Sequence, residues 1–321
     1  MGFLRRLGGD PHGGTDTAAM GRVKFFGDGH AETGDGFYWA ELVTSPSGTF
    51  ALLWRDAPDD NSTAGYRTEG PGRYRLIEDG GGARCDGQLE RPTDGSVAND
   101  GTFVLADLLF TDQMRSRLHI FAADGTETIR RECRANVLTT YIEPEGRYAA
   151  AHLASNPDDE SDDERFVLFD VKRGSEVWSK RLEMGRPDQL EFDVAADALW
   201  MTNAVFGRVR YGLTEGSVNV AALRETALDN ADGFTIMSLV EEDVAAGVSP
   251  DRREDLVAAC LRAADRLVEY PRHEARALRL AGEIVEDVDS ARTLAYWDRA
   301  LAIDPKVGIG KRAAALRDTA R

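Results

Sequence analysis

The chain of 321 residues carries a net charge of −17 and has no basic patch with interleaved aromatic residues, so it lacks the usual pattern of a nucleic-acid-binding protein. Its 42% hydrophobic residues are enough for ordinary cores, which excludes a disordered chain, and its length suggests about two domains. No run approaches the ~20 apolar residues of a membrane span and no signal sequence is recognisable, so we expect a cytoplasmic protein.

Residues 1–18 are rich in glycine and lack periodicity, which predicts a flexible tail. From there to residue 221, short apolar and aromatic runs alternate with Gly and Asp turns, the pattern of half-buried strands. We predict a β domain over residues 19–221. Its clearest strands are Phe37–Val43, Thr49–Trp54, Tyr74–Glu78, Thr102–Phe110, Leu118–Ala122, Tyr148–Leu153, Phe166–Val171, Leu199–Asn203 and Val209–Leu213.

Two turn signals recur along this domain with a period near 50 residues. The first is a turn directly before an apolar strand, at Gly48, Gly101, Gly146 and, more loosely, Asp197. The second is a glycine after a polar residue, at Gly80, Gly125, Gly174 and Gly216. Glycine suits hairpin turns that need a positive φ, so the alternation predicts a repeated unit of four strands.

This pattern resembles the β-propeller repeats of the WD-repeat and quinoprotein-like kinds, although the Trp-Asp and Gly-His markers of WD repeats are absent. The resemblance covers about residues 37–220 and implies four blades stacked face to face. A strand at Arg22–Phe26 could join the last blade and close the ring. The alternative is a two-sheet sandwich or an open curved array.

From residue 222 the apolar residues follow a helical period, which predicts an α-helical domain over residues 222–321. Ser249 and Pro250 are a typical start for one helix, and Asp289 or Ser290 should cap another. The expected helices are Ile236–Ala246, a second from Pro250 to about Tyr270, His273–Glu286, a fourth that ends before Pro305, and 307–319.

The third and fourth of these helices resemble a tetratricopeptide repeat over about residues 274–307. The positions that carry the resemblance are Leu280, Ala281, Ile284, Trp297, Ala300 and Pro305. In that family the first helix lines a groove for peptides, which implies a partner-binding role here for Ala275, Leu278, Gly282 and Val285. These positions lack the Lys and Asn pair that clamps a terminal carboxylate. The alternative is that they pack against the neighbouring hairpin or the β domain.

Lysine occurs at only five positions, and the other basic residues are arginine. Abundant acid with little lysine resembles the proteins of organisms that keep molar salt in the cytoplasm, where a Debye length of ~3 Å screens acidic repulsion. We therefore expect a salt-adapted protein. An ordinary acidic protein is the alternative.

No motif carries recognisable chemistry. The five histidines have no metal-ligand spacing, and His119 and His152 are interpreted as strand residues. The acidic run Asp158–Glu164 lacks the pattern of a calcium loop, so we interpret it as a solvated loop between strands. We predict no catalytic residue, no cofactor and no metal site.

Propeller-like and helical repeats are most often platforms for other proteins, so we expect a non-catalytic interaction or scaffold protein with an unidentified protein partner. We expect neither a nucleic-acid nor a membrane partner. The alternative is an enzyme or small-ligand-binding protein that uses a central funnel of the β domain.

Overall fold

The computed structural model describes residues 23–26, 30–33, 40–56, 71–80, 82–110 and 113–319. They form two compact units, Met1–Gly185 with Thr214–Gly216, and Arg186–Leu213 with Ser217–Arg321. The tail expected over residues 1–18 lies outside the described residues, as does the start of the strand predicted at Phe37–Val43.

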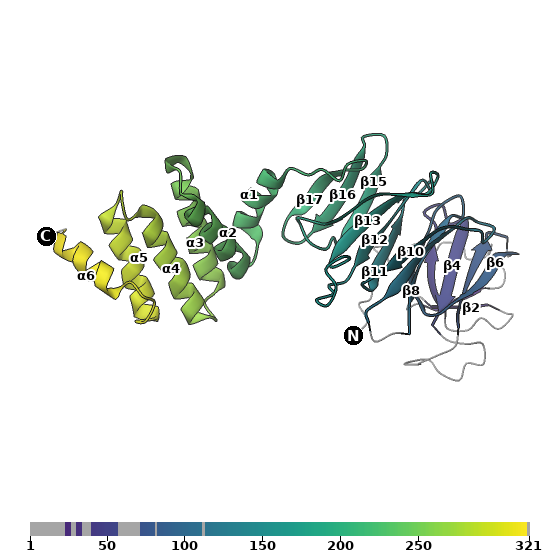
Figure 1. The fold of residues 1–321 in the computed structure, drawn as a ribbon, viewed down its shortest axis with the longest axis horizontal. Helices are drawn as coiled ribbons and strands as arrows, with labels where there is room; N and C mark the ends of the chain where they lie inside the picture. The colour runs from purple at the N-terminus through teal and green to yellow at the C-terminus, as the bar shows by residue number, and fades with distance from the viewer. Residues whose placement is uncertain are drawn as a thin grey trace. The chain divides into compact units, whose positions relative to one another are not determined.

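The described part of the first unit contains three antiparallel sheets whose strands follow the chain order (Figure 1). The first sheet has the strands β1 (Val23–Phe26), β2 (His30–Thr33), β3 (Ala40–Thr44), β4 (Phe50–Arg55), β5 (Gly72–Glu78) and β6 (Gly82–Leu89). The second has β7 (Pro92–Val97), β8 (Phe103–Leu108), β9 (Ser116–Phe121) and β10 (Glu127–Cys133). The third has β11 (Val137–Ile142), β12 (Tyr148–Leu153), β13 (Arg165–Asp170) and β14 (Ser175–Arg181).

Strand β1 pairs with β2, from Val23 opposite Thr33 to Phe26 opposite His30, and so belongs to the first sheet. The prediction that Arg22–Phe26 adds a strand to the last sheet was therefore wrong. Loop-closure entropy favours the observed pairing, because only a few residues separate β1 from β2. Pairing of β1 with the last sheet would instead close a loop that contains most of the β domain, at a larger entropic cost.

Consecutive sheets of the first unit pack face to face. Strand β7 packs against β4 and β3, and β11 packs against β7 and β8. The middle strands, such as β4 and β12, are buried along their whole length, whereas the residues of the last strand of each sheet are almost all exposed or half-buried. This order, a buried middle and an exposed outer strand in each antiparallel meander, is a propeller-like array of sheets.

The repeated turns explain the period of the sequence. Gly48, Gly101 and Gly146 lie in the turns between β3 and β4, β7 and β8, and β11 and β12, and have φ values of 75°, 83° and 72°. Each closes the same turn, as where Gly101 N–H donates to Ala98 O at 3.1 Å. Asp197, at the corresponding turn of the fourth sheet between the strands Gln189–Asp193 and Ala198–Asn203, also has a positive φ of 48°. A positive φ was predicted for the second set of turns, and it is confirmed there, where Gly80, Gly125, Gly174 and Gly216 have φ values between 64° and 96°.

The second unit begins with a three-stranded antiparallel sheet and continues as helices. The strands are β15 (Gln189–Asp193), β16 (Ala198–Asn203) and β17 (Gly207–Gly212). The helices are α1 (Val220–Asn230), α2 (Gly233–Ala246), the 3₁₀ turn η1 (Pro250–Arg252), α3 (Arg253–Arg266), α4 (Pro271–Val285), α5 (Ser290–Ile303) and α6 (Gly310–Thr319). The described chain is therefore four antiparallel sheets followed by six α-helices.

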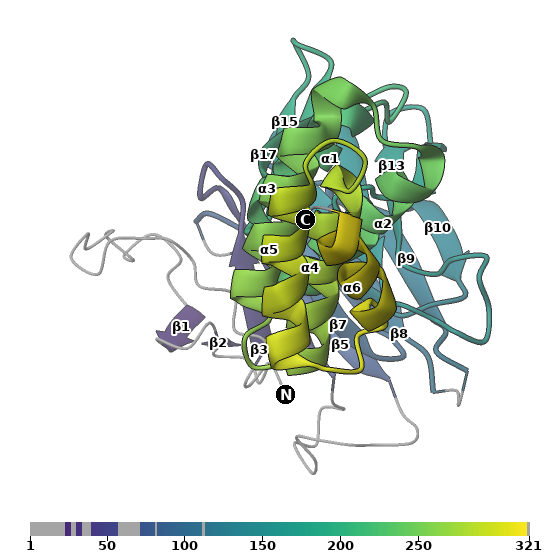
Figure 2. The ribbon, with the colours of Figure 1, turned by 90° about the vertical axis from the view of Figure 1, so that its left-hand side faces the viewer.

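Neighbouring helices lie side by side and share one hydrophobic core (Figures 1 and 2). Trp297 of α5 is its largest fully buried side chain. Asp289 caps α5 by accepting from Arg292 N at 2.9 Å, as expected, whereas Ser249 makes no side-chain cap bond. Helix α1 was not predicted, because its small and scattered apolar residues give only a weak helical stripe.

Candidate functional site

The four residues predicted to line a peptide groove lie on α4 and are all buried. Ala275, Leu278 and Val285 belong to the helical core, and Gly282 faces Trp297 of α5. These contacts fit the alternative interpretation, in which the four residues pack against neighbouring helices. Their role in partner binding stays a prediction, and their burial does not favour it.

A hydrophobic surface occurs instead at the end of the helical hairpins where α4 begins. We call the group Phe234, Val268, Tyr270 and His273 the aromatic surface. Phe234 packs edge-on against Tyr270 and His273, with ring centroids 5.1 and 5.0 Å apart. Phe234, Tyr270 and Val268 are nevertheless 44%, 50% and 61% exposed. Large apolar side chains that gather while still open to water are typical of a surface that contacts another molecule.

Three separate segments bring the aromatic surface together. Phe234 is in the first turn of α2, where the side chain of Asp232 accepts from its N–H at 2.9 Å and fixes the helix start. Val268 and Tyr270 lie between α3 and α4, and His273 is in the first turn of α4. The sequence could not show this grouping, because only the packing of α2 beside α3 and α4 makes these residues neighbours.

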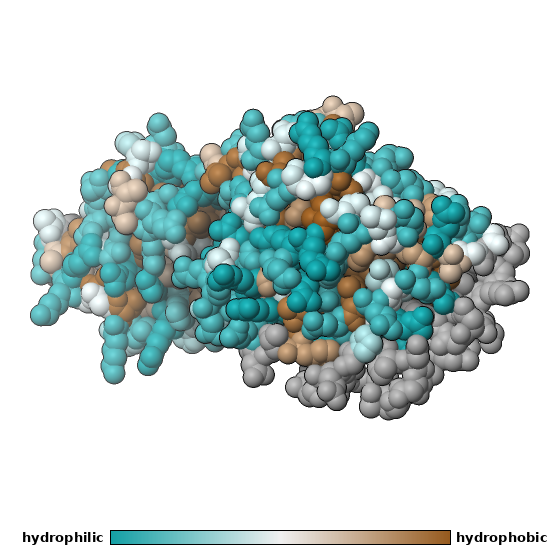
Figure 3. Space-filling view, turned by 45° about the vertical axis from the view of Figure 1, so that its right-hand side comes forward, coloured by the Kyte–Doolittle hydropathy of each residue, from teal (hydrophilic) through white to brown (hydrophobic). Residues whose placement is uncertain are grey.

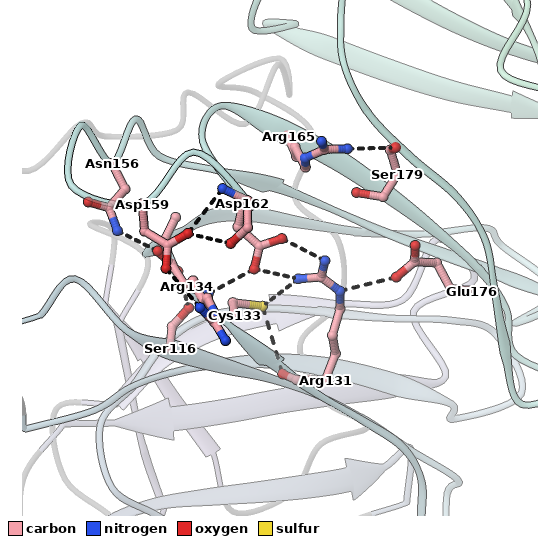
Figure 4. A network of polar contacts seen from close by, with 12 residues as sticks. Ser116, Arg131, Cys133, Arg134, Asn156, Asp159, Asp162, Arg165, Glu176 and Ser179 are labelled. Atoms are coloured by element: carbon pink, nitrogen blue, oxygen red, sulfur yellow. Dashed lines mark hydrogen bonds and ion pairs between the residues drawn. The ribbon is translucent and has the colours of Figure 1, made fainter.

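The first unit contains a network of polar contacts centred on Arg131 of β10 (Figure 4). Its guanidinium binds Asp162 with two nitrogens, at 2.7 and 3.2 Å, and its Nε donates to Glu176 at 3.1 Å. Asp162 lies in the loop before β13 and Glu176 lies on β14, so Arg131 connects the outer strand of the second sheet to the third sheet. Burial by itself would lower the pKa of Arg131. The interactions with Asp162 and Cys133 outweigh this effect, so the pKa of Arg131 is raised.

The acidic loop is held at several points by this network. Asp162 also accepts from Arg134 N at 2.8 Å, and Asn156 Nδ2 donates to Arg134 O at 2.5 Å. Asp159 pairs with Arg134 at 3.1 Å, and hydrogen bonds, first from Ser161, lower its pKa to about 2. The expectation of a simply solvated loop was wrong for Asp162, whose side chain is only 8% exposed.

The thiol of Cys133 lies 3.2 Å from Nη1 of Arg131. Burial raises the pKa of Cys133 and outweighs the opposing effect of the arginine, so the thiol stays neutral at physiological pH. Since Asp162 is fully engaged and Cys133 is not activated, we interpret the network as a structural connection between sheets.

A second polar group surrounds His119 of β9. Its Nδ1 lies 2.5 Å from Glu127 Oε1, and its Nε2 lies 3.6 Å from Asp107 Oδ2. Burial alone would raise the pKa of Glu127, but hydrogen bonds from His119 and Arg130 lower it. His119 and Asp107 are each 2% exposed in their side chains, so a substrate cannot reach them in this conformation.

Among the described residues, no three His, Cys, Asp or Glu side chains are grouped so as to hold a metal ion. No helix in the same residues is long and apolar enough to cross a membrane.

No protein-family model matches the chain, and no curated protein matches its sequence. The structure is similar to the crystal structure of Hsv2 from Kluyvelomyces marxianus, with a TM-score of 0.37 and 10% sequence identity. The match covers 60% of this chain and 52% of that one, so this chain corresponds to about half the length of that protein.

Proposed function

We propose that the protein is a non-catalytic interaction or scaffold protein of a high-salt cytoplasm and that it binds a protein partner through the aromatic surface of its helices. The packing of Phe234 against Tyr270, with both rings about half exposed, carries this proposal. Such a surface fits a partner segment with apolar side chains, because burying it removes apolar area from water.

We further propose that the four sheets are blades of the WD-repeat or quinoprotein-like kind, and that α4 and α5 form a tetratricopeptide-like hairpin. The repeated meander with its Gly turns supports the first assignment. The packing of Trp297 against Gly282 supports the second, since a small residue opposite a large one lets two helices approach closely.

The interaction proposal is tested by a double substitution, Phe234→Ser with Tyr270→Ser, in the full-length protein. Both side chains are about half exposed, so the fold should persist while a partner loses its main apolar contact. Affinity purification from the native host should recover a defined protein with the wild type and lose it with the double variant.

A matched control uses Val288→Ser, because Val288 is 58% exposed at the opposite end of α4. This variant should keep the partner. If the double variant retained the partner as well as Val288→Ser does, the aromatic surface would not be the binding site.

An enzyme that uses the β domain is the second candidate, and Asp107, His119 and Glu127 are the observation that favours it. A histidine between two carboxylates can serve general acid–base catalysis when a substrate reaches it. Its burial ranks this candidate below the interaction protein.

Salt adaptation predicts that removing salt lowers the melting temperature. The net charge of −17 then repels itself over ~30 Å at about 0.01 M salt, compared with ~3 Å at 1 M. Thermal melting followed by circular dichroism in molar and millimolar KCl measures the effect. Equal melting temperatures in both would show an ordinary acidic protein.

A further inference from the structure

The last sheet differs from the others at its outer edge. Each of the first three sheets ends with a strand that follows a Gly turn, namely β6, β10 and β14. After β17 the chain passes the corresponding Gly216 but continues into α1. Within the described residues, no strand pairs with the outer edge of β17.

The backbone of β17 presents hydrogen-bonding groups at this edge. Gly212 N–H points away from β16 and donates to Ser217 O at 2.7 Å, whereas Leu213 N–H donates to Asp197 O on the β16 side. The pairing of β16 and β17 has no register shift, so Arg208 and Arg210 direct their N–H and C=O groups outward like Gly212. An exposed edge of this kind is a template for an added strand.

Two of the three complete sheets show which side chains such a strand would carry. Arg75 on β5 pairs with Asp86 directly opposite on β6, at 2.6 Å. Arg117 on β9 pairs with Glu132 directly opposite on β10, at 2.8 Å. In these two sheets an arginine of the second-last strand is thus matched by a carboxylate of the last strand, whereas in the third sheet Arg165 on β13 lies opposite Arg181 on β14.

Strand β17 carries arginines as β5 and β9 do, but within the described residues no further strand pairs with it. Arg208 precedes Gly216 by eight residues, as Arg117 precedes Gly125. Arg208 at present reaches Glu191 of β15 at 2.8 Å, and Arg210 donates to Ala196 O at 3.0 Å. All of these residues are exposed or at the surface, so a carboxylate from an added strand can compete for the two guanidinium groups.

We propose that the outer edge of β17 binds an extended segment of a partner protein with acidic residues at alternate positions. The added strand gains backbone hydrogen bonds to Arg208 and Arg210 and ion pairs with their side chains. A second copy of β17 fits poorly, because antiparallel pairing would place arginines opposite arginines. This inference rests on the proposed interaction function but names a different surface and a partner chemistry.

The test uses a labelled peptide, acetyl-Thr-Val-Glu-Val-Glu-Val-Thr-amide, and the same peptide with Lys in place of Glu. Binding to the full-length protein is measured by fluorescence anisotropy at the lowest salt concentration that keeps it folded. We expect saturable binding of the acidic peptide, about tenfold tighter than that of the basic one. Hydrogen exchange should slow at the amides of Arg208 and Arg210.

Arg208→Glu with Arg210→Glu should reverse the preference between the two peptides. Arg210→Pro removes one outward N–H together with the charge of Arg210, so it should weaken binding of the acidic peptide more than Arg210→Gln, which removes the charge alone. Arg173→Glu, at an exposed turn of the third sheet, should change neither.

Equal affinity for both peptides, no saturable binding, or unchanged exchange in β17 would overturn the inference. A dimer in sedimentation that is abolished by Arg210→Pro would overturn it in favour of a second copy. If the wild-type protein captures a partner through the aromatic surface but does not bind the acidic peptide, only the inference about β17 fails. If the acidic peptide binds but the partner is still captured by the variant Phe234→Ser with Tyr270→Ser, only the proposal for the aromatic surface fails.

Discussion

Gly282→Ala is expected to destabilise the helical part by about 2 kcal/mol, although alanine is the better helix former. A Cβ at Gly282 would lie 2.4 Å from both Cδ1 and Nε1 of Trp297, far inside van der Waals contact. Trp297 is fully buried and its Nε1 donates to Arg279 O at 3.2 Å, so the indole cannot move without losing packing and a hydrogen bond. This overpacking, ~1–3 kcal/mol, exceeds the gain of up to ~1 kcal/mol from helix propensity.

The matched control is Gly310→Ala at the start of α6, where a Cβ meets no atom within 4 Å. It should leave stability unchanged or raise it by a few tenths of a kcal/mol. Urea unfolding followed by tryptophan fluorescence and by circular dichroism measures both variants. A stabilised Gly282→Ala would mean that α4 and α5 can separate at little cost, which would contradict the close packing of this hairpin.

The buried strands could be predicted from the sequence because burial requires apolar residues, and a run of apolar residues is the pattern by which a strand is recognised. Strands β4 and β12 are buried along their length, so their residues are apolar and stand out between turns. The outer strand β10 was missed, because an exposed strand needs only backbone pairing along one edge and tolerates the polar run Glu127–Cys133. The repeated glycine turns were predictable because positive φ restricts the residue type.

The candidate sites were less predictable. The family resemblance pointed to one face of α4, but that face is buried against the neighbouring helices. The aromatic surface and the pair Arg131 and Asp162 each join segments far apart in the sequence, and no local pattern marks them. Tyr270 was visible only as the residue before a helix-breaking proline.

Arg131→Met is expected to destabilise the first unit by about 3 kcal/mol, because it leaves the carboxylate of Asp162 buried without its cation. Asp162 would keep only the N–H of Arg134 as a partner, and Glu176 would lose its contact with β10. The side chains of Arg131 and Asp162 are 19% and 8% exposed, so water can compensate only in part. Chemical unfolding followed by circular dichroism measures the loss.

The neighbouring Arg130 provides the control for the same substitution. Its side chain is 56% exposed and pairs with Glu127 at 3.0 Å, so Arg130→Met should cost no more than ~1 kcal/mol. Asp162→Asn on the background of Arg131→Met should recover part of the loss, because an amide is easier to bury than an unpaired carboxylate and can still accept from Arg134 N. If Arg131→Met cost as little as Arg130→Met, the contact would be a surface ion pair and would not hold the second and third sheets together. Recovery in the double variant would instead identify the unpaired charge of Asp162 as the source of the instability.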